Sequence, residues 1–104
     1  MKIILKSRLG THYATADYDG NKLTVLPGSK INMVLQYDAM PDVIKGLRTD
    51  TSVVSSTGEV LKNVDFTSPS AAAQFVTGRS VNGYVSWRID DKISLKEYRK
   101  QNGL

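Results

Sequence analysis

The stretch that decides the fold reads FTSPSAAAQFVTGRSVNGYVSWRI, over residues 66–89. Ser68 and Pro69 are typical of a helix start, because a serine hydroxyl accepts hydrogen bonds from the free backbone amides and proline fits the first turn. Gly78 is the kind of residue that ends a helix. The sequence therefore predicts a helix over residues 68–77.

The second half of this stretch predicts a turn followed by a strand. Asn82-Gly83 is a pair typical of tight turns, in which glycine takes up a positive φ. Beyond it, Val85, Trp87 and Ile89 alternate with polar side chains, a spacing typical of a strand with one buried face. We expect this strand to pack on the preceding helix, with Trp87 in the core. The helical side chains expected at that contact are Ala72, Phe75 and Val76.

Shorter patterns on either side complete the expected fold. Gly20 sits in a predicted hairpin turn. Ser94 and Glu97 have the spacing of a capping box, which predicts a helix over residues 95–101. The run 30–36 is compatible with either a strand or a helix. The remaining expected elements are strands at residues 2–6, 11–18 and 22–26, a helix around residues 40–47, and a hairpin or loop across residues 52–66.

These elements mix short strands with two or three short helices and show no regular alternation of strand, helix and strand. The expected class is α+β, with a mostly antiparallel sheet. The chain has 104 residues, the length of one domain, so we expect residues 1–104 to form a single domain. Its 40% hydrophobic and 23% charged residues are ordinary for a soluble globular protein.

The charge of the chain permits an anionic partner without demanding one. The formal net charge is +4 and the isoelectric point is about 9.4. Each half of the chain carries seven Lys or Arg side chains against five Asp or Glu side chains. Since there is no run of like charge, a nucleic-acid surface would have to be assembled by folding.

The residue types exclude several kinds of catalytic site. The chain has no cysteine, which rules out a disulfide, a thiolate nucleophile and cysteine-held zinc. His12 is the only histidine, too few for a two-histidine metal site. Asp90 and Asp91 fall at a turn signal, where aspartate accepts backbone hydrogen bonds. We therefore expect no enzyme activity, no catalytic or metal-ligating residue and no cofactor. With no long apolar run, we also expect a cytoplasmic protein without membrane contact.

The segment after the first predicted helix is the best candidate for a binding surface. Arg79 follows the helix end, where its guanidinium could contact a phosphate or a base edge, supported by the hydroxyl of Ser80. Tyr84 and Arg88 share the outward face of the expected strand, which suits base stacking and phosphate contact. Asn82 completes the set of candidate nucleic-acid-binding residues.

Each of these residues also has a purely structural explanation. Arg79 could instead bond the last helix carbonyls or pair with an acidic residue. Asn82 suits a turn, and an exposed Tyr84 beside Arg88 also occurs on sheets that bind nothing. The cations on or before the last helix complement its dipole or touch phosphate; they are Lys92, Lys96, Arg99 and Lys100.

A family resemblance rests on FTSPSAAA (residues 66–73) and GRSVNGY (residues 78–84), followed by Trp87 and Leu95. These motifs resemble an uncharacterised domain of bacteria, archaea and viruses that often stands at the C-terminus of GIY-YIG endonuclease-like and restriction–modification-associated proteins. More distantly, they are similar to the restriction-enzyme adenine-methylase-associated domain, a proposed reader of modified DNA. The specific part of the resemblance covers residues 64–99.

Two positions depart from the family pattern. Tyr84 stands where a tryptophan is usual, and Asp91 where the family commonly has a turn glycine. The chain carries no nuclease signature. The resemblance implies a non-catalytic module that binds nucleic acid, in particular DNA, and supports a nuclease or restriction–modification system beside a nuclease or methylase subunit. The alternative is a protein–protein interaction module that docks a partner subunit without nucleic-acid contact.

Overall fold

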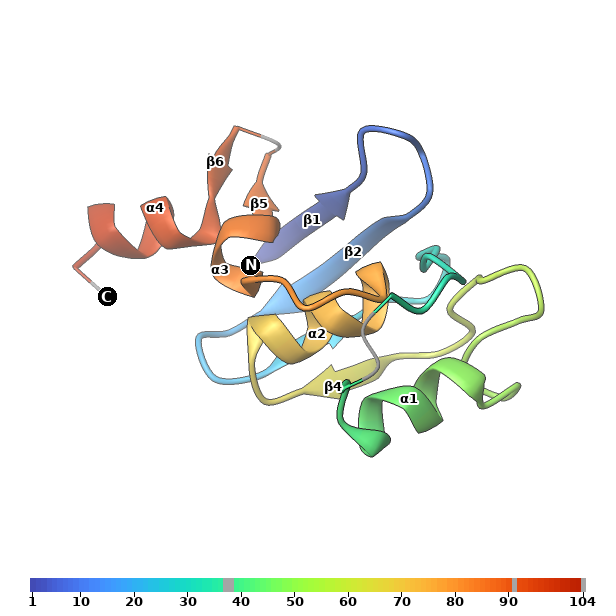
Figure 1. Cartoon of the computed structure of the whole chain (residues 1–104). Coiled ribbons are helices and arrows are strands. Elements are labelled where there is room, and N and C mark those ends of the chain that lie inside the picture. The colour runs from blue at the N-terminus through green and yellow to red at the C-terminus, as the bar shows by residue number, and fades with distance from the viewer. Residues whose placement is uncertain (37–38, 91, 104) are drawn as a thin grey trace.

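A computed structural model describes residues 1–36, 39–90 and 92–103. Within these residues, six strands form one antiparallel sheet with the order β4-β3-β2-β1-β5-β6, and four helices accompany it (Figure 1). The strands are β1 (Lys2–Lys6), β2 (Tyr13–Tyr18), β3 (Leu23–Val25), β4 (Val64–Phe66), β5 (Arg88–Ile89) and β6 (Ile93–Ser94). The helices are α1 (Asp42–Thr49), α2 (Pro69–Thr77), α3 (Gly83–Ser86) and α4 (Leu95–Gln101). The predicted α+β class is confirmed.

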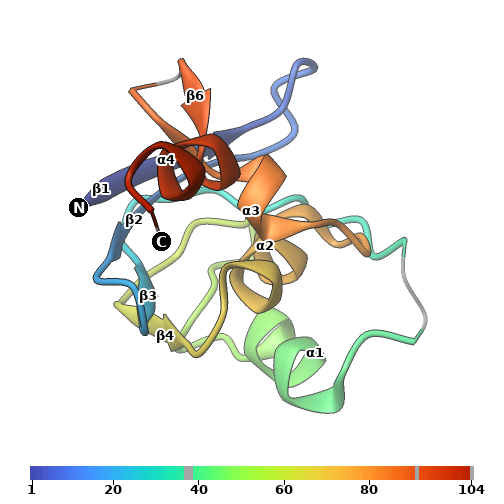
Figure 2. The same cartoon turned by 90° about the vertical axis from the view of Figure 1, so that its left-hand side faces the viewer.

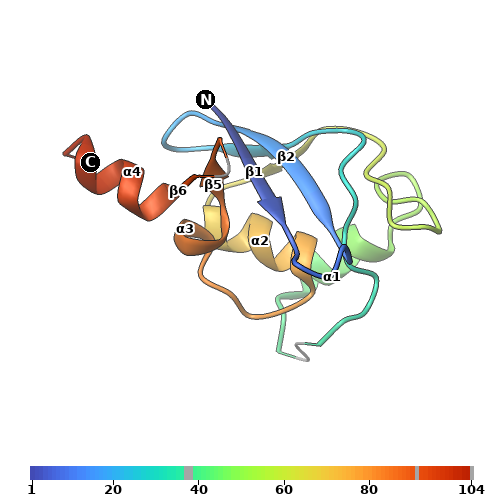
Figure 3. The same ribbon diagram turned by 90° about the horizontal axis from the view of Figure 1, so that it is seen from above.

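The sheet has one covered face and one open face. Ile3 pairs with Ala16, which pairs with Val25, and all three are buried. Helix α2 packs against β3 and β4 on this covered face, and α1 packs against α2 (Figures 2 and 3). Because side chains alternate along a strand, Ile4 and its partner Thr15 belong to the opposite, open face.

The helix predicted from the Ser-Pro start is confirmed as α2. The Ser68 hydroxyl accepts a hydrogen bond from the Ala71 amide at 3.1 Å. At the other end, Gly78 has a φ of 72°, and its amide donates to the Gln74 carbonyl at 3.0 Å. The helical side chains Ala72, Phe75 and Val76 are buried as expected. Their partner differs from the expected strand with Val85 and Trp87, because the Phe75 ring centroid lies 5.3 Å from that of Phe66 in β4.

The strand predicted over residues 84–89 is wrong in its first half, because residues 83–86 form the short helix α3. Asn82 caps this helix, since its side-chain oxygen accepts a hydrogen bond from the Tyr84 amide at 2.9 Å; it does not form a hairpin turn. Val85 is consequently 48% exposed instead of buried. The prediction for Trp87 is confirmed, because the indole is fully buried and donates to the Pro69 carbonyl at 3.1 Å.

The elements predicted from the shorter sequence patterns are confirmed in part. The first hairpin and the strand before it are confirmed as β1 to β3, and the helix predicted from the capping box is α4 with its expected bounds. Ser94 caps α4 by accepting from the Glu97 amide at 3.1 Å. The ambiguous run 30–36 is neither helix nor strand beyond an isolated bridge at Lys30. Asp90 lies in the turn between β5 and β6 with a φ of 53°, whereas Asp91 lies outside the described residues.

The close approach of α3 to α2 yields a stability prediction. A Cβ atom at Gly83 would meet the carbonyl carbon and oxygen of Pro69, which are backbone atoms and cannot move alone. Gly83→Ala should therefore lower the free energy of unfolding by about 1–3 kcal/mol. Gly46 in α1 has nothing within 4 Å of its Cβ position. Gly46→Ala should instead raise stability by about 0.5–1 kcal/mol, because alanine is the better helix former.

Urea unfolding of the two glycine variants measures both effects on the same protein. Equal and small effects of the two substitutions would contradict the packing of α3 on the start of α2.

Candidate nucleic-acid interface

The candidate residues after α2 are placed at two ends of that helix. Arg79 and Ser80 are exposed just beyond its C-terminal end. Helix α3, which carries Tyr84, lies at its N-terminal end, since the Gly83 amide donates to the Ser70 hydroxyl at 3.0 Å. A helix of nine residues is about 13 Å long, so Arg79 and Tyr84 are not direct neighbours.

Arg88 lies on the other side of the sheet from Arg79. It pairs with Ile4, whose side chain belongs to the open face, whereas Arg79 follows α2 on the covered face. Arg88 there borders a hollow with Lys6 and Arg8 from the end of β1. The expected strand face shared by Tyr84 and Arg88 is therefore not formed, whereas a nucleic-acid role for Arg79, Tyr84 and Arg88 stays a prediction. That shared face required one continuous strand, and α3 breaks that strand.

The structure instead brings Tyr84 together with the last helix. The guanidinium carbon of Arg99 lies 4.6 Å from the centre of the Tyr84 ring, a cation–π contact. Lys96, Arg99 and Lys100 lie on one side of α4, because residues three and four apart are neighbours on a helix. With Tyr84 and Asn82 they line an open hollow of about 440 Å³, the basic hollow.

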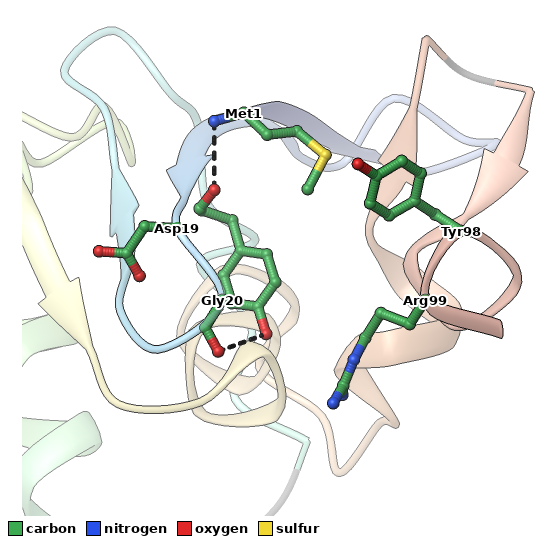
Figure 4. Close-up of a pocket in the computed structure, with 6 residues that line it drawn as sticks. Met1, Asp19, Gly20, Tyr98 and Arg99 are labelled. Carbon is green, nitrogen blue, oxygen red and sulfur yellow. Dashed lines mark hydrogen bonds between the residues drawn. The ribbon is translucent and has the colours of Figure 1, made fainter. Parts of the chain in front are cut away.

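A second hollow lies next to the basic hollow and shares Arg99 with it. Its volume is about 310 Å³, and we call it the tyrosine hollow. Figure 4 shows the Met1 side chain extending toward Tyr98, with Arg99 below Tyr98. The residues that line it are Met1, Tyr18, Asp19, Gly20, Tyr98 and Arg99. We call the two hollows together the α4 cleft.

The polar groups at the base of the tyrosine hollow are held by the turn between β2 and β3. The Tyr18 hydroxyl donates to the Gly20 carbonyl at 3.2 Å, and the Met1 amino group donates to the Tyr18 carbonyl at 3.1 Å. Burial raises the pKa of Tyr18 above its usual value, and the neighbouring Tyr84 raises it further. Tyr18 therefore remains a neutral phenol at physiological pH.

The electrostatic balance of the α4 cleft is positive. Among residues 1–36, 39–90 and 92–103, Lys96, Arg99 and Lys100 have no acidic partner. The nearest lining carboxylate, that of Asp19, accepts hydrogen bonds from the Lys22 and Asn21 amides, which lower its pKa. In Figure 4 this carboxylate points away from Tyr98 and Arg99. Three cations on α4 thus remain available to an anionic ligand.

Sequence reasoning found part of this cleft and missed the rest. The sequence indicates Tyr84 and Asn82 as candidates, and it is compatible with either a helix-dipole or a phosphate role for the cations of α4. Tyr18 and Tyr98 were not predicted as site residues. The spacing of Lys96 and Lys100 on a capped helix can be recognised from neighbouring residues. Tyr18 lies near α4 only because of the way the strands pair, and no pattern close to it in the sequence indicates this.

No three His, Asp or Glu side chains of the described residues gather closely enough to hold a metal ion. No described helix is long and apolar enough to cross a membrane.

Comparison with known proteins gives one match. The sequence matches the family DUF4357, described as a domain of unknown function, over residues 4–99, from β1 into α4. No curated protein and no solved structure matches the chain. The family match includes the whole of α2 and α3 and every residue that lines the basic hollow except Lys100. The chain belongs to the DUF4357 family.

Proposed function

We propose that this domain binds nucleic acid, DNA in particular, through the α4 cleft and without catalysing a reaction on it. The observation that carries the proposal is the group of three α4 cations beside the Tyr84 ring, which have no acidic partner in the part of the chain that the structure describes. Lys and Arg side chains on one surface supply the phosphate contacts that dominate nucleic-acid affinity. The Tyr84 ring lies against the Arg99 guanidinium and holds this cation at the surface of the cleft.

In this proposal the domain is an accessory module of a nuclease or restriction–modification system. Support comes from the resemblance of residues 64–99 to domains attached to such proteins. A separate nuclease or methylase subunit would then carry out the chemistry. The domain would contribute affinity for the DNA on which that subunit acts.

Removal of two cations from the cleft tests the binding surface. Lys96→Ala with Lys100→Ala should weaken DNA binding by about ten- to thirtyfold near 0.1 M salt, because two phosphate contacts are lost. The slope of log affinity against log salt should become shallower by about two. Fluorescence anisotropy with a labelled DNA measures both quantities.

The matched control is Lys30→Ala with Lys62→Ala, which removes the same charge from exposed positions outside the cleft. This control variant should retain most of the wild-type affinity and slope. Equal weakening in the two double variants would mean that overall charge, and not the α4 cleft, determines binding.

A second candidate function is a protein–protein interaction module without nucleic-acid contact. It is favoured by the exposed apolar side chains of Met33 and Leu35, which border a hollow beside α1. Such a partner would bind with a shallow salt dependence, and Leu35→Ser would weaken it. Failure to bind any DNA at low salt would favour this candidate.

A further inference from the structure

The tyrosine hollow has the size and walls of a site for one planar ring. Ligand pockets in proteins run from about 300 to 1,000 Å³, so a hollow of about 310 Å³ takes a single ring system. Tyr18 borders the hollow from β2 but is only 5% exposed, so the side chains open to a ligand are those of Met1, Tyr98 and Arg99. Tyr98 of α4 is partly buried against the core. The thioether of Met1 lies beside the Tyr98 ring (Figure 4).

Arg99 joins this ring-sized space to the phosphate-binding side of the cleft. Its side chain lines both hollows, and its guanidinium lies over Tyr84 between them. A nucleotide whose base entered the tyrosine hollow would leave its sugar and phosphate at Arg99. The neighbouring phosphates of the same strand would then reach Lys96 and Lys100.

A base can enter such a hollow only when it is free of its pairing partner. In a duplex each base is paired and stacked, and extruding one costs a few kcal/mol. In a single strand the bases are available to stack on aromatic side chains, which contributes about 1–3 kcal/mol per base. The arrangement of Tyr98 and Arg99 beside the hollow is thus matched to unpaired nucleotides.

We infer that the α4 cleft binds single-stranded DNA, with one unpaired base in the tyrosine hollow and the adjoining phosphates on the basic hollow. This inference rests on the proposed function and specifies its ligand. It assigns a role to Tyr98 that phosphate binding alone does not require.

The experiment compares two probes on the untagged chain, because Met1 and α4 both line the cleft. The probes are a fluorescein-labelled oligothymidylate of about 12 nucleotides, the length that small binding domains cover, and a duplex of the same length. Wild-type protein should bind the single strand at least about fivefold more tightly than the duplex. Tyr98→Ala should weaken single-strand binding about tenfold and change duplex binding by less than about twofold.

Three variants separate stacking from other effects. Tyr98→Phe keeps the aromatic face and should bind the single strand nearly as wild type does. Tyr98→Leu keeps an apolar contact with the core while it removes the π face, so it should bind as weakly as Tyr98→Ala even if the alanine variant loses stability. Tyr13→Ala removes an exposed ring from the open face of the sheet and should change nothing.

The outcomes distinguish this inference from the function on which it rests. Equal or tighter binding of the duplex, or a Tyr98→Leu variant that binds the single strand as wild type does, would overturn the inference. In that case, loss of duplex binding in the Lys96/Lys100 double variant would still support the proposed function. If neither probe binds at low salt, both the proposed function and the inference are overturned.

Discussion

Phe75→Ala should lower the free energy of unfolding by about 3–5 kcal/mol, the range for truncating a fully buried phenylalanine. Phe75 has no exposed surface, and its ring packs on that of Phe66 in β4. The contact fixes α2 on the sheet, and α2 in turn carries α1 and α3. The loss should therefore combine the transfer cost of the ring with the cost of a cavity that the surrounding helices cannot fill.

Urea unfolding followed by tryptophan fluorescence measures this loss, because Trp87 is the only tryptophan and is fully buried. The control is Val43→Ala on α1, where the side chain is 77% exposed and the expected change is within about 0.5 kcal/mol. A loss below about 1 kcal/mol for Phe75→Ala would contradict the packing of α2 on β4.

The parts of the fold that were predictable from sequence depend on hydrogen bonds between near neighbours. Ser68 and Ser94 each cap a helix by accepting from the amide three residues later. Gly78 ends α2 with a positive φ and a bond to a carbonyl four residues earlier. Such contacts are fixed by spacing along the chain, so the sequence is sufficient to predict them.

The error at residues 84–89 has the opposite cause. Val85, Trp87 and Ile89 alternate as a strand does, but a four-residue helix is too short to show a helical period. What makes the segment turn is Gly83, which lets the backbone touch Pro69 fourteen residues earlier in the chain. A contact between segments this far apart leaves no mark in local hydrophobic periodicity.

The same distinction between local and long-range contacts applies to the candidate site. Local spacing predicts that Lys96 and Lys100 share one side of α4, and the structure agrees. The meeting of α4 with Tyr18, however, depends on the order of strands in the sheet. The separation of Arg79 from Arg88 likewise depends on the pairing of β5 with the open-face residue Ile4. Neither arrangement can be read from residues close in sequence.

One further residue without a predicted role has a large expected effect on stability. Arg48 is 8% exposed, and its guanidinium donates to the carbonyls of Phe75 and Asn32, each at 2.5 Å. The Phe75 carbonyl belongs to the last turn of α2, where carbonyls lack partners within the helix. Arg48 therefore ties three segments together, namely α1, the end of α2 and the run 30–36.

Arg48→Met should lower the free energy of unfolding by about 2–4 kcal/mol, since each buried carbonyl left without a donor costs about 1–3 kcal/mol. The loss is smaller than the sum of two such costs, because the variant no longer buries a charge. That burial is the cause of the lowered pKa of Arg48, and among the described residues no carboxylate compensates it.

Two comparison variants test whether the two hydrogen bonds of the Arg48 guanidinium account for the loss of stability. Arg48→Lys keeps a charge but offers a single ammonium that cannot span both carbonyls, so it should fall between Arg48→Met and wild type. Arg79→Met makes the same chemical change at an exposed arginine and should alter stability by less than about 0.5 kcal/mol. Urea unfolding could instead show that Arg48→Met and Arg79→Met are equally stable. The carbonyls of Phe75 and Asn32 would then have other hydrogen-bond donors in the Arg48→Met variant. Arg48 would then not be what holds the run 30–36 against α2.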